Sequence, residues 1–203
     1  MRRLVIIEMM SIDGFYTGTG NDVSVMPYDS AFEAYNIERI SAADTVLLGR
    51  TSYDEFAGFW PPLAGDPEAS PGAREFARIY NGLEKVVVAH HKTPADLTGI
   101  WKDSTRIIND DAHRHVAELL SGAGKDVVMW ASRTLWIDLV RHGIDAELHL
   151  VVGNGLVGAG VPMFGGADGI ELTGLGAPRR LPESESILLT YAVTAGGTPR
   201  SAG

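Results

Sequence analysis

The chain has 203 residues, of which 45% are hydrophobic, contains no cysteine and carries a formal net charge of -9. A chain of this length buries roughly 70% of the surface that its unfolded form exposes, so one domain can fold without disulfides or a structural metal. The negative charge argues against binding to nucleic acid or to an anionic membrane surface, and no apolar run approaches the ~20 residues of a membrane span. Since a short apolar segment rather than a signal peptide follows Met1-Arg2-Arg3, we expect a cytoplasmic protein.

The first part of the chain predicts a strand, a loop and then alternating helices and strands. Residues 2–10 are apolar on both faces apart from Glu8, as in an interior strand that is covered on both sides, and Asp13-Gly14 predicts the turn that ends it. The polar and glycine-rich residues 16–22 predict an irregular loop. The elements predicted next are a helix over 29–42, a strand over 45–48, a helix from Thr51 to Gly58 and a proline-rich loop over 60–72.

The rest of the chain continues the alternation and ends in two successive strands. The predicted elements are a helix over 72–81, strands over 85–89 and 105–108, a helix from Asp110 or Asp111 to Gly122, a strand over 126–130, a helix from Ser132 to Val140, a strand over 147–152, a glycine-rich loop over 153–160, and antiparallel strands within 169–176 and 186–193. This order predicts one α/β domain over residues 1–194, with a mainly parallel sheet and an antiparallel edge, and a frayed tail over 195–203.

The stretch from residue 45 to residue 56 predicts an anion site. A buried strand breaks at Gly49, and Thr51-Ser52-Tyr53-Asp54 has the pattern of a capping box at the start of a helix. Such a junction offers backbone N–H groups, the positive end of a helix dipole and, here, Arg50, all of which suit a phosphate. The arrangement recurs at Ala131-Ser132, which favours a dinucleotide lying across the strand ends. The alternative is that Gly49 is only a turn glycine and Arg50 a surface charge.

Several segments carry a resemblance in the order in which they occur. They are Arg3 to Gly14, Leu48 to Tyr53, Val86 to Ala89, Ser132 to Leu135 followed by 143–148, and Gly158 to Phe164. Over about residues 2–193 the chain resembles the dihydrofolate reductase-like family, whose members include the reductase domain of riboflavin biosynthesis. The resemblance implies a three-layer fold that binds NADPH, hydride transfer to a pterin-like, pyrimidine-like or carbonyl substrate, and a homodimer.

The resemblance also implies roles for individual residues on the cofactor side. Gly49, Arg50 and Thr51 match the first cofactor turn of the family; Ala131, Ser132 and Thr134 lie at the second, where relatives usually have glycine in place of Ala131; Ala89 and His90 lie near the adenosine end; and Gly158 and Gly160 match a late loop beside the active-site cleft. Three of these residues also have simpler interpretations, since Ser132 can be a helix cap and Gly158 and Gly160 can belong to a turn.

The catalytic side has three candidate carboxyl groups. Asp13 matches the Ser-x-Asp-Gly turn of the family, although Asp-Gly is also a common turn without chemistry. Glu33 lies roughly where a dihydrofolate reductase carries its acid. Glu8, within a buried strand, needs a partner or a raised pKa, and is either structural or a proton source.

No metal site is expected. The adjacent His90 and His91 at a strand end point to opposite faces, and His113 and His115 on one helix are poorly placed to share an ion.

Two other interpretations of the sequence remain open. One is a sensor or regulatory dimer that binds NADP(H) without catalysis, which would lack a proton donor facing the nicotinamide. The other is a flavodoxin-like or Rossmann-like domain, which is disfavoured because no G-x-G-x-x-G follows the first strand.

Overall fold

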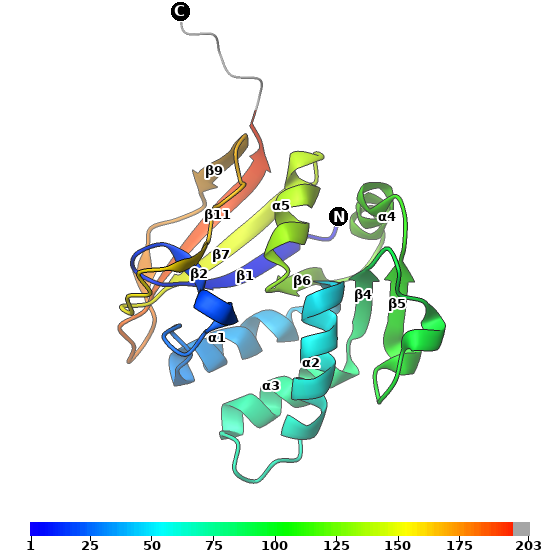
Figure 1. The fold of residues 1–203 in the computed structure, drawn as a ribbon, viewed down its shortest axis with the longest axis horizontal. Helices are drawn as coiled ribbons and strands as arrows, with labels where there is room; N and C mark the ends of the chain where they lie inside the picture. The colour runs from blue at the N-terminus through cyan, green and yellow to red at the C-terminus, as the bar shows by residue number, and fades with distance from the viewer. Residues whose placement is uncertain (197–203) are drawn as a thin grey trace, which may run out of the picture.

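The computed structural model describes residues 1–196 and arranges them as helices on both faces of one twisted sheet (Figure 1). The strands of this sheet are β1 (Leu4–Met10), β3 (Ala43–Gly49), β4 (Glu84–Val88), β5 (Thr105–Ile108), β6 (Asp126–Trp130), β7 (Ala146–Val152), β9 (Ile170–Gly174), β10 (Arg179–Arg180) and β11 (Ile187–Ala195). Their order is β10-β11-β7-β1-β6-β3-β4-β5, with β9 also paired to β11. Strands β1 and β3 to β7 pair in parallel, whereas β11 is antiparallel to β7, β9 and β10. The predicted parallel sheet with an antiparallel C-terminal edge is confirmed.

The helices are α1 (Ser30–Ser41), α2 (Arg50–Leu63), α3 (Pro71–Gly82), α4 (Ala112–Ser121) and α5 (Arg133–Arg141), with short 3-10 helices at Thr19–Asn21, Pro94–Asp96 and Lys102–Ser104. Successive side chains of a strand point to opposite faces. Accordingly Ile7 of β1 packs in the cluster that contains residues of α1, α2 and α3, and Ile6 packs in the cluster that contains residues of α4 and α5. The sheet is therefore the middle of three layers. Within residues 1–196, none of the helices combines the length and the apolar character of a membrane span.

The loop predicted over 16–22 contains a strand instead. β2 (Phe15–Gly18) pairs antiparallel with β8 (Gly160–Pro162) in a separate two-stranded sheet. Gly160 allows this approach, since a Cβ there would lie only 2.0 Å from the carbonyl oxygen of Thr17. Phe15, Tyr16 and Thr17 are residue types that favour a strand, but the glycines that follow favour a loop, and the pairing partner comes from a distant segment.

The helix predicted to end at Gly58 continues to Leu63 through Pro61 and Pro62. Trp60 explains the extension: its side chain is buried, and its ring centroid lies 4.7 Å from that of Phe76 in α3. Packing of this aromatic side chain outweighs the low helix propensity of the prolines, which lie in the last turn. The predicted irregular loop over 60–72 is thus reduced to residues 64–70.

The C-terminal tail was predicted to begin at residue 195. Ala195 is the last residue of β11, and most of the predicted tail, from residue 197 onward, lies outside the described residues.

Candidate functional site

Two strand-to-helix turns lie side by side at the carboxyl edge of the sheet. β3 and β6 are neighbouring strands, β3 leads into α2, and β6 leads into α5 through Ala131 and Ser132. The backbone N–H of Gly49 donates to Oγ of Ser132 at 3.0 Å, and the backbone N–H of Ser132 donates to Oγ of Ser52 at 3.1 Å. These hydrogen bonds join the two turns into one surface, which we call the joined turns.

The helices that begin at the joined turns lack side-chain caps. The capping box predicted at Thr51 to Asp54 is wrong, because α2 begins at Arg50 with Gly49 at its N-cap position, and within residues 1–196 no side chain caps it. Ser132 occupies the N-cap position of α5, as predicted, but it makes no capping hydrogen bond to described residues and its hydroxyl serves Gly49 instead.

The contrast with other helices of the same domain is informative. Asp29 caps α1 by accepting a hydrogen bond from the N–H of Phe32 at 2.9 Å, and Ser70 caps α3 by accepting one from Ala73 at 3.0 Å. The first N–H groups of a helix have no intrahelical partner. Within residues 1–196, α4 also lacks a side-chain cap, but the starts of α2 and α5 are the ones joined by the hydrogen bonds above. Apart from the N–H of Leu135, which donates to the carbonyl of Ser132 at 2.8 Å, the first-turn N–H groups of α2 and α5 are available for an anion, next to the positive ends of two helix dipoles.

Gly49 is not required by the protein's own backbone or packing. Its φ is -78°, which any residue can adopt. A Cβ at this position would lie 3.7 Å from Oγ of Ser132 and 3.9 Å from Cβ of Leu135, both of which are ordinary contact distances. The missing side chain leaves room at the joined turns that the protein itself does not use, and so it fits a ligand that approaches the backbone closely.

Ala131 and Ser132 both have left-handed backbone conformations, with φ of 54° and 57°. This region favours glycine, because in other residues Cβ approaches the carbonyl oxygen. The backbone geometry therefore favours glycine at position 131. The chain tolerates alanine there at a conformational cost.

Cations surround the first turn. Arg50 lies 3.3 Å from Asp54, and its side chain is 59% exposed. Lys92 also binds Asp54, at 2.8 Å, although its side chain is only 13% exposed. One carboxylate thus holds two cations beside the start of α2, where they can meet a phosphate with charge-assisted hydrogen bonds. Sequence reasoning did not single out Lys92. Its signal is a lysine just after His90 and His91, in the segment that follows β4.

The remaining residues predicted to bind the cofactor differ in how accessible they are to a ligand. Ala89 is buried, and both its backbone groups are used: its N–H donates to Ile108, and its carbonyl accepts from the side chain of Asn109. His90 is exposed, with Nδ1 3.2 Å from the carbonyl oxygen of Asn109. Thr51 and Thr134 are exposed in the first turns of α2 and α5.

Asp13 braces the glycine-rich loop. Its carboxylate accepts hydrogen bonds from the N–H groups of Val157 at 3.2 Å and of Gly158 at 2.8 Å. The hydroxyl of Ser11, followed by the N–H of Gly158, lowers the pKa of Asp13. An ionised carboxylate with these partners is suited to holding the loop rather than to donating a proton. Glycine at position 158 is explained by the backbone alone, because its φ of 73° lies in the left-handed region that favours glycine.

Glu33 lies between two helices and away from Asp13's loop. Its carboxylate accepts a hydrogen bond at 2.8 Å from the hydroxyl of Ser70, the residue that caps α3. A Cβ on Gly72 would lie 2.6 Å from Oε2 of Glu33. These contacts give Glu33 a place in the packing of α1 against α3, and the structure does not bring it together with Asp13.

Glu8 is buried in β1 beneath α5. Its Oε1 accepts a hydrogen bond from the indole N–H of Trp136 at 3.1 Å. Burial raises the pKa of Glu8 well above its ordinary value, and the Trp136 hydrogen bond and the charge of Arg133 oppose this only in part. Burial and then the charge of Glu8 also raise the pKa of Tyr16 on β2. Glu8 is therefore a buried carboxyl group with a raised pKa, which Trp136 of α5 holds through one hydrogen bond.

The sequence matches the family model of the RibD C-terminal domain over residues 2–179. This chain belongs to the RibD C-terminal domain family. Membership confirms the resemblance read from the motifs and makes the chain an oxidoreductase domain of the reductase type. No curated protein matches the sequence.

Solved structures share the fold of this RibD C-terminal domain at low identity. A protein from Shewanella described as a riboflavin biosynthesis protein is 17% identical with a TM-score of 0.64, and the match covers 96% of this chain and 99% of that one. The deaminase/5-amino-6-(5-phosphoribosylamino)uracil reductase of Thermotoga maritima is 11% identical with a TM-score of 0.62, covering 94% and 56%. Dihydrofolate reductase from Enterococcus faecalis, complexed with NADP(H), is 10% identical with a TM-score of 0.56, covering 94% and 96%. At these identities the likeness establishes the dihydrofolate reductase-like fold.

Proposed function

We propose that this RibD C-terminal domain binds NADPH at the joined turns and reduces a small heterocyclic or carbonyl substrate, of pterin or pyrimidine type. The observation that carries the proposal is the pair of uncapped helix N-termini joined by the hydrogen bond from Gly49 to Ser132. Two dipole ends and a glycine that the packing does not require together suit a pyrophosphate.

The residues present fit the proposed cofactor. The N–H groups that begin α2 and α5 would hold the pyrophosphate, and Ser132 keeps the two helix starts together. Arg50 and Lys92 would bind the 2′-phosphate that distinguishes NADPH from NADH, with Asp54 orienting both cations. Bound NADPH supplies the hydride, while the chain aligns the reactants and keeps water away.

The proton that accompanies the hydride needs a donor, and Glu8 has the best chemistry among the candidate carboxyl groups. Burial raises the pKa of Glu8, whereas Asp13 has a lowered pKa and the carboxylate of Glu33 is held by Ser70. We expect Glu8→Gln to lower kcat while the Kd for NADPH changes little. The pH dependence of kcat should also flatten in this variant, since the titrating group is gone. An unchanged pH profile of kcat would show that Glu8 has only a structural role.

The cofactor half is tested by titrating the protein with NADPH and NADH while nicotinamide fluorescence is followed. Loss of one charge-assisted contact costs about 1.5–3 kcal/mol, so Arg50→Ala and Lys92→Ala should each raise the Kd for NADPH by roughly 10- to 100-fold and leave NADH binding much less affected. The matched control is Arg106→Ala, which removes an arginine of β5 that is 46% exposed and lies 3.5 Å from the carboxylate of Glu84. Wild-type NADPH affinity in both Arg50→Ala and Lys92→Ala would refute this cofactor site.

The rival function is an NADP(H)-binding sensor or regulatory protein without turnover. To separate the two, NADPH oxidation should be followed with pterins, pyrimidines and quinones as acceptors. Oxidation that depends on one acceptor class supports the reductase, whereas saturable binding of NADPH without oxidation in any class supports the sensor.

We also infer a homodimer located in the cytoplasm, as the resemblance implies. Exposed apolar side chains on the C-terminal strands, Leu172 and Ile187, support the dimer, because such side chains are commonly covered by a partner subunit. Analytical ultracentrifugation across a concentration series tests it, and a monomer at all concentrations would contradict it.

A further inference from the structure

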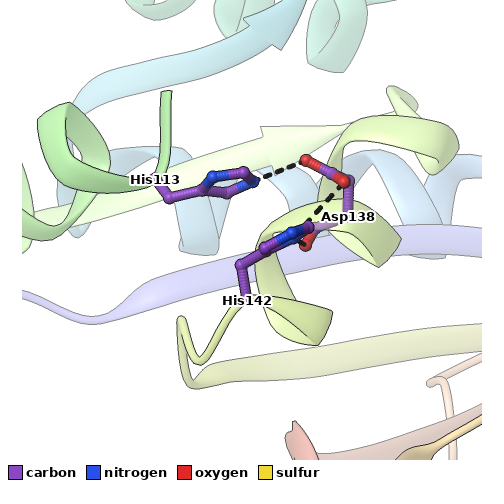
Figure 2. A group of neighbouring side chains, drawn as sticks. All are labelled: His113, Asp138 and His142. Atoms are coloured by element: carbon purple, nitrogen blue, oxygen red, sulfur yellow. Dashed lines mark hydrogen bonds and ion pairs between the residues drawn. The ribbon is translucent and has the colours of Figure 1, made fainter. Parts of the chain in front are cut away.

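Three metal-ligating side chains meet between α4 and α5, apart from the joined turns. His113 lies in the first turn of α4, Asp138 lies in α5, and His142 directly follows the last residue of α5. Figure 2 shows both imidazole rings pointing toward the Asp138 carboxylate. One potential ligand atom from each residue lies within 4.8 Å of the others. We call these residues the His–Asp–His cluster.

The contacts within the cluster are close. Nε2 of His113 lies 2.8 Å from Oδ2 of Asp138, and Nδ1 of His142 lies 3.4 Å from Oδ1 of the same carboxylate. The two rings are stacked with centroids 3.8 Å apart and planes 22° apart. Nδ1 of His142 also lies 2.8 Å from the backbone carbonyl oxygen of Asp138. Because a carbonyl oxygen can only accept, Nδ1 donates this hydrogen bond and Nε2 of His142 carries the free lone pair.

We propose that the His–Asp–His cluster binds a divalent transition-metal ion of the zinc class. Two imidazole nitrogens and one carboxylate oxygen form a ligand set that zinc and its neighbours in the series prefer to calcium or magnesium. The formal net charge of -9 favours the approach of a cation.

To accept the ion, His142 must release the carbonyl oxygen of Asp138, which lies 2.8 Å from its Nδ1, and the two stacked rings must turn out of their nearly parallel planes. Zinc ligands at about 2.0–2.1 Å place their donor atoms ~3.3 Å apart in a tetrahedral site. The side chains of His113, Asp138 and His142 are 36%, 50% and 54% exposed, so they can rotate to close the present spacing. This exposure also leaves a fourth position open to water. The site is therefore of the three-ligand, open type.

The metal would act on the packing of α4 against α5, not on the reduction. His142 lies at the opposite end of α5 from Ser132, roughly 15 Å along a helix of 1.5 Å rise per residue. A metal bridge there fixes two helices that are joined in the chain only through β6 and its flanking turns. Its effect should be a higher Tm with unchanged NADPH affinity.

The experiment uses the full-length chain without an affinity tag, first stripped with EDTA. Isothermal titration with Zn²⁺ should give one saturable site per chain, and Co²⁺ should give the visible absorption bands of a low-coordinate site. We expect Zn²⁺ to raise the Tm by several degrees. In His113→Ala and His142→Ala the Kd for Zn²⁺ should rise at least tenfold, and the rise in Tm should disappear.

The matched control is His115→Ala. This residue lies on the same helix and near two carboxylates, with its ring nitrogens 4.0 Å from Asp110 and 3.6 Å from Glu118. It should keep wild-type zinc binding. The proposal is overturned if His113→Ala and His142→Ala bind zinc like the wild type, if His115→Ala loses binding equally, or if no one-to-one binding saturates at micromolar Zn²⁺. Because all three histidines are at least partly exposed, circular dichroism should show each variant folded. The Co²⁺ spectrum of Asp138→Asn gives an independent measurement on the same cluster.

Discussion

Ala131 offers a direct test of the strained second turn. Its φ of 54° lies in the left-handed region, which costs an L-residue about 1–2 kcal/mol relative to glycine. Replacement by glycine removes this cost, but it also increases the conformational entropy of the unfolded chain, which lowers the free energy of unfolding by about 0.4–1 kcal/mol. We therefore expect Ala131→Gly to raise the free energy of unfolding by about 0.5–1 kcal/mol. In a domain of this size that corresponds to a Tm higher by ~1–4 °C.

Urea unfolding followed by tryptophan fluorescence measures this change. The matched control is Ala34→Gly, the same substitution at an exposed position inside α1, where helix propensity predicts a loss of about 1 kcal/mol. The two variants should thus change stability in opposite directions. If Ala131→Gly is as destabilising as Ala34→Gly, the left-handed conformation at Ala131 does not carry the strain inferred for it.

Further predictions concern single contacts. Ser132→Ala removes the acceptor for the N–H of Gly49 and should cost about 1–3 kcal/mol in urea unfolding, whereas the exposed Thr134→Ala should cost much less. Burial lowers the pKa of Lys85 to about 7 from 10.5, so between these pH values the unfolded chain binds more protons than the folded one. The free energy of unfolding should therefore rise with pH in this range, by at most ~1.4 kcal/mol per pH unit. Lys85→Met should abolish this slope, and a wild-type protein without the slope would contradict the burial argument. The pKa of Asp13 is lowered below 3.8, so its hydrogen bonds to the glycine-rich loop should persist above that pH and weaken as the pH falls through the folded-state pKa. Asp13→Ala should speed proteolysis within residues 153–160 at neutral pH. An unchanged cleavage rate would show that these hydrogen bonds are not needed to order the loop.

The position of most helices and strands follows from local sequence patterns. The apolar runs of β1, β3, β4 and β6 and the helical spacing in α1 were sufficient, because burial on both faces of a parallel sheet needs continuous apolar strands. Capping was less predictable. Asp29 caps α1 as expected. The hydroxyl of Ser132 does not cap α5, because it accepts a hydrogen bond from the N–H of Gly49 instead.

The sequence by itself thus determined the order of the elements, the family and the presence of two strand-to-helix turns. Tertiary structure alone decided which of their groups meet. Ser132 reaches Gly49 across 83 residues, β2 pairs with β8, and His113 joins Asp138 rather than His115. The physical reason is the range of the interactions. Apolar periodicity and turn preferences act between near neighbours in the chain, whereas a hydrogen bond or a shared ligand depends on where the packed sheet brings distant residues together.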